Sequence, residues 1–335
     1  MRPFALVESP LQVLGLVDAI AAGFLVAPRT VVRSAPAATT LAQLCPALAR
    51  LQSTSARTPF TTSPPRRSAP RTSGIVLGDA LSGQGQLWLV AARRSSHVLL
   101  LDDGTATLRV VDALLGRGTL ARWVGRETRG RRLLATAALR RLRAHATNGT
   151  LTLRTCIPLP DNDVVELMRN GVAVVQHRLD HVRALGVADT FPEDVVILGS
   201  ALADDGLIDR ARYDRWAERL VDEAVAHART VRYLAHRREP RERLERLARA
   251  GARTTPSSLP AELSLSGLGP GRRLVTLPTS VLLTVGGLLT AAGVEVDVHD
   301  VPDAWWTPHT SPSVRAHLSA PSHIHAATSR PTGGS

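Results

Sequence analysis

The sequence predicts an α/β protein with two domains, each built around a parallel β-sheet. Short apolar runs typical of buried strands recur along the chain, and each leads into a polar or glycine-containing loop and then into apolar residues at helical spacing. Three such units come first, with strands expected at 4–7, 74–77 and 98–101. Strands that alternate with helices in this way favour parallel sheets.

A second series of the same kind begins near Val195. Its strands are expected at 195–198, 231–235, 274–277 and 294–298, with a long helix over 210–229. The segment 186–193 separates the two series. We therefore expect an N-terminal domain over residues 1–190, a C-terminal domain over 191–308 and a frayed tail over 309–335.

The composition limits the classes of function and the cellular compartment that the sequence is compatible with. The net charge is +12, and all 41 basic residues are Arg because the chain contains no Lys. This bias is typical of a GC-rich genome, and it is equally compatible with attraction to anionic glycans, nucleotide phosphates or an anionic membrane face. Cys45 and Cys156 lack metal-like spacing, which argues against a disulfide framework and a structural zinc site. The sequence shows no signal peptide and no membrane-length apolar run, so we expect a cytoplasmic protein.

Two segments stand apart from the strand and helix pattern. The segment 57–73 is rich in Pro, Ser, Thr and Arg and predicts a surface loop. The segment 129–145 predicts an Arg-studded helix. Its charges indicate either a solvated helix face or a docking surface for a membrane or an anionic acceptor.

The most informative polar residues of the first series are Asp102, Asp103 and Gly104. They follow an apolar strand, at the end where open α/β sheets present catalytic groups. A carboxylate there could accept a proton from an attacking hydroxyl. An ordinary turn with a helix cap would also explain these residues. The sequence shows no further metal ligands clustering with the acidic pair, so we expect no metal site.

The second series carries two comparable constellations. His236, Arg237, Arg238 and Glu239 follow an expected strand, and an imidazole beside two guanidinium groups could donate to a phosphate. The pair Thr279 and Ser280 follows the next expected strand and opens an apolar helix. Hydroxyls and N–H groups at such a point can bind an anion, although a plain helix cap explains them equally well.

Taken together, these motifs resemble those of bacterial sialyltransferases and polysialyltransferases. That family shares an acidic-acidic-Gly motif, a His-Pro motif and a Ser/Thr-Ser motif, in this order. The segments Val7–Gln12, Gly78–Asp79 and Leu198–Leu202 also look like the polysialyltransferase-like group. The resemblance implies a GT-B-like fold, in which two Rossmann-like domains face an inter-domain cleft. One departure is that Arg237 stands where the family has Pro.

The resemblance also implies roles for individual residues. On the acceptor side, Asp102 is favoured over Asp103 as general base. On the donor side, His236 contacts the CMP phosphate and assists its departure, and either Glu262 or Glu239 binds the ribose. Further residues expected at the donor are Arg237, Gly199, Ser200, Thr279 and Ser280, and those expected near the acceptor are Ser9, Pro10, Gln12 and Gly104.

The expected function is inverting transfer of sialic acid or a related nonulosonic acid from a CMP-activated donor to a cell-surface glycan or glycolipid. No cofactor, no obligatory metal and no nucleic-acid partner are expected, and peripheral contact with the membrane is compatible with the basic charge. Three different functions also fit the sequence: a transferase for another nucleotide sugar, a catalytically inactive relative, and a basic polyanion-binding protein. Dispersed Arg residues and scarce aromatic residues disfavour nucleic-acid binding.

Overall fold

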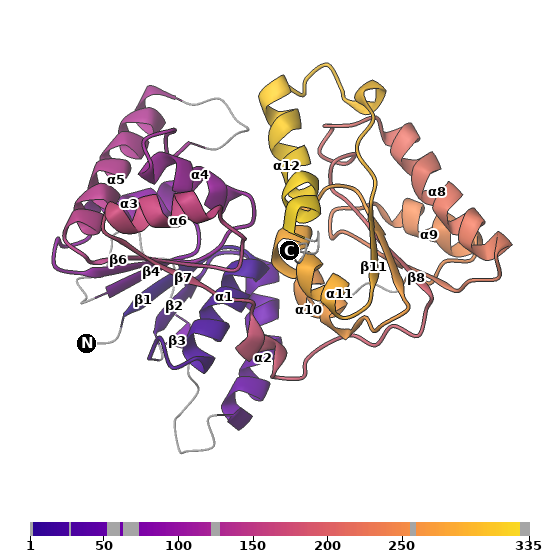
Figure 1. The fold of residues 1–335 in the computed structure, drawn as a ribbon, viewed down its shortest axis with the longest axis horizontal. Helices are drawn as coiled ribbons and strands as arrows, with labels where there is room; N and C mark the ends of the chain where they lie inside the picture. The colour runs from indigo at the N-terminus through magenta and orange to yellow at the C-terminus, as the bar shows by residue number, and fades with distance from the viewer. Residues whose placement is uncertain are drawn as a thin grey trace, which may run out of the picture. The chain divides into compact units, whose positions relative to one another are not determined.

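The computed structural model describes residues 3–26, 28–51, 61–62, 74–121, 128–254 and 259–328. The chain divides into two compact units, unit 1 over Met1–Val187 and unit 2 over Ala188–Ser335. Each unit has its own parallel sheet flanked by helices (Figure 1). The predicted class, two α/β units with parallel sheets, is confirmed.

Unit 1 contains a seven-stranded sheet with the order β3-β2-β1-β4-β5-β6-β7, in which every neighbouring pair is parallel. The strands are β1 (Phe4–Val7), β2 (Arg29–Val32), β3 (Thr61–Thr62), β4 (Gly74–Leu77), β5 (His97–Leu100), β6 (Leu151–Thr155) and β7 (Val172–Gln176). This is the strand order of dinucleotide-binding folds, extended by one strand. The order reverses between β1 and β4, so the loops after these two strands diverge to opposite faces of the sheet.

Helices cover both faces of this sheet. Figure 1 shows α3 (Gly83–Ala91), α4 (Ala106–Leu114), α5 (Arg129–Thr147) and α6 (Asp161–Arg169) on one face, and α1 (Pro10–Ala21) and α2 (Ala35–Leu51) on the other. The short helix α7 (Asp180–Arg183) packs against α1. Because both faces are covered, the central strands β1 and β4 are buried along their whole length, and they consist of apolar runs instead of alternating patterns.

Unit 2 contains a four-stranded parallel sheet with the order β11-β10-β8-β9. The strands are β8 (Val195–Leu198), β9 (Val231–Leu234), β10 (Arg273–Thr276) and β11 (Glu295–Val298). The first strand of the unit, β8, has β9 on one side and β10 on the other. The strand order therefore reverses between β8 and β10.

The helices of unit 2 are α8 (Arg210–Ala226), α9 (Arg241–Arg249), α10 (Ala261–Ser264), α11 (Gly287–Ala291) and α12 (Pro312–Thr328), with short turns η1 (Leu265–Gly267), η2 (Leu282–Gly286) and η3 (Asp303–Trp305). Alternate residues of β8 serve two different cores. Val195 and Ile197 pack in the cluster that contains α8 residues, whereas Val196 and Leu198 pack in the cluster that contains η2 and α11 residues. This alternation is what a strand covered on both sides requires.

Two expectations about local structure need correction. The tail expected to be frayed contains helix α12, which is held to the unit by Leu318, packed against the cluster that contains α8 residues, and by Arg315 over the ring of Trp306. The loop expected over 57–73 contains strand β3, because Thr61 and Thr62 extend the sheet beside β2; the rest of that segment lies outside the described residues.

The expected helix over 129–145 is present as α5. Its Ala135, Ala138 and Leu142 are buried, whereas Arg132 and Leu133 are exposed. A solvated face and a docking surface both remain predictions. Among the described helices, none combines the length and the apolar character needed to cross a bilayer.

Candidate active site at the carboxyl edges of the two sheets

In unit 1, the loops at the reversal of strand order carry the first predicted site residues. Ser9 follows β1 and caps helix α1, where its Oγ accepts from the Gln12 N–H at 3.4 Å, and Pro10 is the first residue of the helix. Gly78 follows β4, and its backbone N–H donates to the carbonyl of Leu6. Open α/β sheets bind their ligands at such a reversal point.

Asp103 reaches this point from the neighbouring strand β5. Its Oδ1 accepts from Gln12 Nε2 at 2.7 Å and from Ser9 Oγ at 3.1 Å. Gln12 is only 1% exposed, and its Oε1 accepts from the Glu8 N–H at 2.6 Å. A Cβ at position 78 would lie 2.0 Å from Gln12 Oε1, so Gly78 is needed for this side chain to pass. Gln12 therefore holds Asp103 in place and is too buried to form a surface contact with a substrate.

Asp102, its neighbour, points into the protein. Its carboxylate accepts from Thr155 Oγ1 at 2.6 Å and from the Cys156 N–H at 2.5 Å, and the residue is 2% exposed. Both partners stand at the end of β6. Gly104 follows with a φ of 61°, a left-handed conformation that glycine adopts without strain. Of the two carboxylates, only the one of Asp103 is partly exposed.

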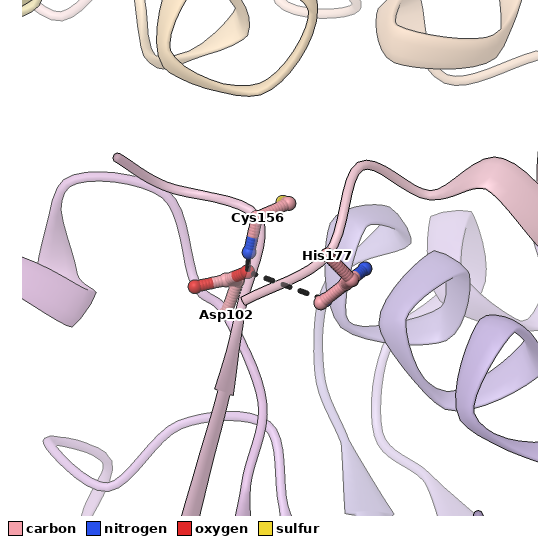
Figure 2. Close-up of side chains that lie close together, drawn as sticks. All are labelled: Asp102, Cys156 and His177. Carbon is pink, nitrogen blue, oxygen red and sulfur yellow. Dashed lines mark hydrogen bonds and ion pairs between the residues drawn. The ribbon is translucent and has the colours of Figure 1, made fainter. Parts of the chain in front are cut away.

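His177 joins Asp102 from the end of β7. The side chains of Asp102, Cys156 and His177 lie close together (Figure 2), with His177 Nε2 4.0 Å from Asp102 Oδ2. The expectation that no further ligand-type side chains accompany the acidic pair is therefore wrong for Asp102. Asp102 and Cys156 are 54 positions apart in the chain, and they meet because parallel strands end at the same edge of the sheet.

Asp18, on helix α1, completes this buried cluster. Its Oδ2 lies 2.6 Å from Arg154 Nη2 and 3.3 Å from His177 Nδ1, and its Oδ1 accepts from the Val182 N–H. Burial by itself would raise the pKa of Asp18, but the hydrogen bonds from His177 and Arg154 lower this pKa well below its usual range. Asp18 is therefore an anion throughout the neutral and mildly acidic pH range.

A basic depression adjoins the same edge of unit 1. It is lined by Glu8, Arg33, Ser82, Gly83, Gln84 and Arg131. Arg33 pairs with Glu8 at 2.5 Å. The Arg131 guanidinium crosses the start of α3, where a Cβ at position 83 would lie 2.3 Å from Arg131 Nη1. The two Arg residues give this depression a positive character that suits an anionic group.

In unit 2, the predicted donor residues follow three adjacent strands. Gly199 and Ser200 come after β8, His236 after β9, and Thr279 and Ser280 after β10. Thr279 Oγ1 accepts from the Val281 N–H at 3.4 Å, and the helical segment that begins at Ser280 leads through η2 into α11. Both hydroxyl residues are partly exposed. The reversal of strand order between β8 and β10 makes this edge the expected ligand site of the unit.

The loop that carries His236 is anchored by Glu239. Glu239 Oε2 accepts from the His236 N–H at 2.7 Å, and the Glu239 N–H donates to the His236 carbonyl. The Arg238 N–H donates to His236 Nδ1 at 3.3 Å. These bonds close the loop although no proline follows His236. Burial lowers the pKa of His236, and the adjacent charges of Arg237 and Arg238 lower it further.

Glu239 is itself fixed by a buried network. Its Oε1 accepts from Tyr233 Oη at 2.5 Å, from Tyr213 Oη at 3.0 Å and from Arg243 Nη1 at 3.2 Å. Burial raises the pKa of Glu239, although these hydrogen bonds oppose the rise. With both oxygens occupied inside the unit, Glu239 supports the loop and is poorly placed as the ribose ligand. Glu262 is the remaining candidate; it lies on α10, where burial raises its pKa and the Arg237 charge opposes the rise.

Gly199 leads to a testable consequence. A Cβ at this position would lie 2.1 Å from Glu239 Oε2 and 3.0 Å from the backbone nitrogen of His236. Because Glu239 is held on several sides, we expect Gly199→Ala to displace the His236 loop and, in the donor role expected from the sequence, to weaken CMP binding by about 10-fold or more, as the loss of one charge-assisted hydrogen bond would. Isothermal titration with CMP measures this effect. Gly269→Ala is the control, since among the described residues no atom besides those of its chain neighbours lies within 4 Å of its added Cβ, and equal affinities in both variants would contradict the expectation.

Several site residues are not recognisable in the sequence pattern. Thr155 is the last residue of β6, Cys156 and His177 directly follow β6 and β7, and Asp18 lies inside an apolar helix. Only the position at the end of a strand could have singled out the first three. Tyr213 and Tyr233 lie at core positions and show no sequence signal for their shared contact with Glu239.

The fold and the site define the class of this protein: two doubly wound α/β units, each with polar and ionisable side chains at the carboxyl edge of its sheet. No protein-family model and no curated protein matches the chain. Two solved structures are similar over 98% of this chain and 100% of theirs, at 13% identity and a TM-score of 0.41. They are the E. coli heptosyltransferase WaaC with ADP and the same enzyme with ADP-2-deoxy-2-fluoro heptose. At this level the similarity carries no argument about function.

Proposed function

We propose that the protein is an inverting glycosyltransferase that uses a CMP-activated nonulosonic acid. The observation that carries the proposal is the placement of three motifs in the family's order. The acidic pair, the His and the Thr-Ser pair each follow a parallel strand after one or two intervening residues, at the edge where such sheets bind ligands. The resemblance supplies the donor class.

We assign the donor phosphate to unit 2. Ser280, Thr279 and Ser200 offer hydroxyls beside the reversal point of the sheet, and His236 offers an imidazole from the strand on the other side of β8. Glu262 remains the candidate for the ribose hydroxyls. In this proposal the phosphate becomes the leaving group, and His236 stabilises the charge that develops on it.

We assign the acceptor to unit 1, and the general base to Asp103. Asp102 lies inside the protein with both oxygens engaged, whereas Asp103 is partly exposed at the reversal point. The depression lined by Arg33 and Arg131 lies at the same edge and would hold a carboxylate or phosphate of the acceptor. An anionic cell-surface glycan or glycolipid fits this arrangement.

The proposed reaction balances without a cofactor. The acceptor hydroxyl oxygen forms a bond to the anomeric carbon while the bond from that carbon to the CMP phosphate oxygen breaks. The hydroxyl proton moves to Asp103, and CMP leaves with the electron pair of the broken bond. Attack from the face opposite to the leaving group inverts the anomeric centre.

Selective stabilisation by CMP is the first test. A ligand that binds only the native state raises the apparent stability, by about 2.7 kcal/mol at a concentration 100 times its Kd. We expect CMP to raise the Tm, and UDP, GDP and ADP to have a smaller effect. Stabilisation by another nucleotide alone would indicate a different nucleotide-sugar transferase. No response to any of them would favour an inactive relative or a polyanion-binding protein.

The variant Ser280→Ala refines this test. The residue is partly exposed at the start of a helical segment. We expect the substitution to weaken CMP binding by several-fold, as the loss of one hydrogen bond of about 1 kcal/mol would, with little change in the Tm of the free protein. Unchanged CMP affinity would remove the phosphate role from Ser280.

The lowered pKa of His236 predicts that the protein takes up a proton when it binds CMP. In the protein without a ligand, the pKa of His236 is lowered from 6.5, so the imidazole is largely neutral near neutral pH. A bound phosphate favours the charged imidazolium and raises this pKa, so binding takes up a proton when the pH lies between the two pKa values. We therefore expect CMP affinity to increase as the pH falls toward 6. Titration calorimetry in buffers of different ionisation enthalpy measures the uptake, and His236→Asn should lose it; identical uptake in that variant would assign the proton to the nucleotide itself.

A further inference from the structure

We propose that Asp102, Cys156 and His177 form a binding site for one thiophilic divalent cation of the Zn²⁺ type. The three residues follow the adjacent strands β5, β6 and β7, and their ligand atoms all lie within 4.8 Å of one another (Figure 2). The proposal concerns binding only and does not depend on the proposed transferase activity.

An unpartnered nitrogen is the independent observation behind this proposal. The His177 side chain is 8% exposed, and its Nε2 is buried without a hydrogen-bond partner among the described residues. It faces the carboxylate of Asp102 across 4.0 Å, a distance too long for a direct hydrogen bond. A buried polar atom of this kind requires an explanation, and an ion bound between the two groups provides one.

The surroundings of His177 favour a lone pair on Nε2. Its Nδ1 lies 3.3 Å from Asp18 Oδ2 and can donate a proton to this carboxylate. Nε2 then carries no proton and faces a second carboxylate, which is an arrangement that a cation stabilises. The competing arrangement places a proton on Nε2, since the Leu179 N–H also lies 3.3 Å from Nδ1. A proton and a metal ion are thus the two candidates for the position between His177 Nε2 and the Asp102 carboxylate.

The charges of the cluster favour a cation. Asp18 and Asp102 are both almost completely buried, and Arg154 Nη2 pairs with Asp18 at 2.6 Å. Among the described residues, Asp102 accepts hydrogen bonds from Thr155 Oγ1 and the Cys156 N–H, and neither donor carries a charge. Burying a carboxylate against neutral donors is costly, and a metal ion would balance its charge.

The donor set selects the metal. A thiolate, an imidazole nitrogen and a carboxylate oxygen are ligands that Zn²⁺ takes together, whereas Mg²⁺ and Ca²⁺ prefer oxygen alone. The supporting contacts also fit, because Asp18 would orient the ligating His177 and Thr155 would orient the ligating Asp102. Three protein ligands leave a fourth position for water or for a further group.

Metal titration of the full-length protein tests the site. After treatment with a chelator and its removal, the protein is titrated with Co²⁺. We expect one equivalent to bind, with a thiolate-to-cobalt charge-transfer band, and Zn²⁺ to displace it. In Cys156→Ser this band should vanish and Zn²⁺ affinity should fall by more than about 10-fold, because changes in supporting residues alone already cost about 10- to 100-fold.

Matched variants separate this site from other metal-binding groups. Cys45→Ser removes the chain's other thiol, and a double His323→Ala, His325→Ala variant removes two histidines near the C-terminus. We expect both to bind Co²⁺ like the wild type, and His177→Gln to bind it weakly. Absence of stoichiometric binding in the wild type, or binding that survives in both Cys156→Ser and His177→Gln, would overturn the proposal; the first result would leave a proton as the occupant.

Discussion

In the proposed reaction, replacing Asp103 by Asn should lower kcat by about 100- to 10,000-fold, the usual contribution of a general base. The amide keeps an oxygen that can accept from Gln12 Nε2 and Ser9 Oγ, so the side chain should stay where it is. It loses only the ability to accept a proton from the acceptor. We therefore expect unchanged CMP affinity and an unchanged Tm. Turnover is measured as the release of CMP from a CMP-activated sialic acid in the presence of a panel of glycan acceptors.

Asp102→Asn is the matched comparison, because it makes the same chemical change one residue away. Here the carboxylate is enclosed between Thr155 and Cys156, so the amide must place its NH₂ group against one of two donors. We expect a loss of stability of about 1–3 kcal/mol, the cost of an unsatisfied buried hydrogen-bonding group. If Asp102→Asn abolished turnover at unchanged stability while Asp103→Asn remained active, the assignment of the base would pass to Asp102.

The strand-to-loop positions of the site were predictable because they depend on local pattern. An apolar run followed by Asp102-Asp103-Gly104, or by His236, specifies a strand and the loop at its end. In a parallel sheet all strands end at the same edge, so the sequence also predicts that such loops gather there. The structure confirms this for unit 1 and for unit 2 separately.

The environment of each residue was not predictable, because it depends on contacts between distant segments. Whether Asp102 or Asp103 faces solvent is decided by β6, which brings Thr155 and Cys156 over the first of them. Likewise, nothing local in the sequence connects Glu239 with Tyr213, which belongs to α8. The sequence pattern therefore predicts which residues lie at the edge of the sheet, whereas tertiary packing decides which of their side chains remain accessible.

Arg243→Met should lower the free energy of unfolding by about 3–5 kcal/mol, the cost of removing one member of a buried ion pair. The Arg243 side chain is 1% exposed. It bonds to Asp204 at 2.6 Å, to Asp214 at 2.5 Å and to Glu239 at 3.2 Å, and it lies over the ring of Tyr213. Burial by itself would lower the pKa of Arg243, but the bonds to these carboxylates raise it. Met fills a similar volume, so the loss should come from three carboxylates left without their shared cation.

Arg241→Met on the same helix is the control. Arg241 is 91% exposed and pairs with Glu245 at the surface, and such surface pairs contribute about 0–1 kcal/mol. Urea unfolding followed by circular dichroism and tryptophan fluorescence compares the two variants. Similar losses in both would mean that the buried network contributes no more to stability than a surface pair.

The pH dependence of the Arg243→Met loss should reflect Glu239, because Asp204 keeps Arg210 and Asp214 keeps Arg246 when Arg243 is removed. The folded-state pKa of Glu239 is already raised above 4.5 by burial, and removal of the guanidinium should raise it further. A carboxyl group whose pKa is higher in the folded state takes up its proton there first as the pH falls, so acid favours the folded state for this group. The difference between variant and wild type should therefore shrink between pH 7 and pH 5. Arg243→Met with Glu239→Gln should show a smaller pH dependence, because the neutral amide at position 239 has no proton to gain.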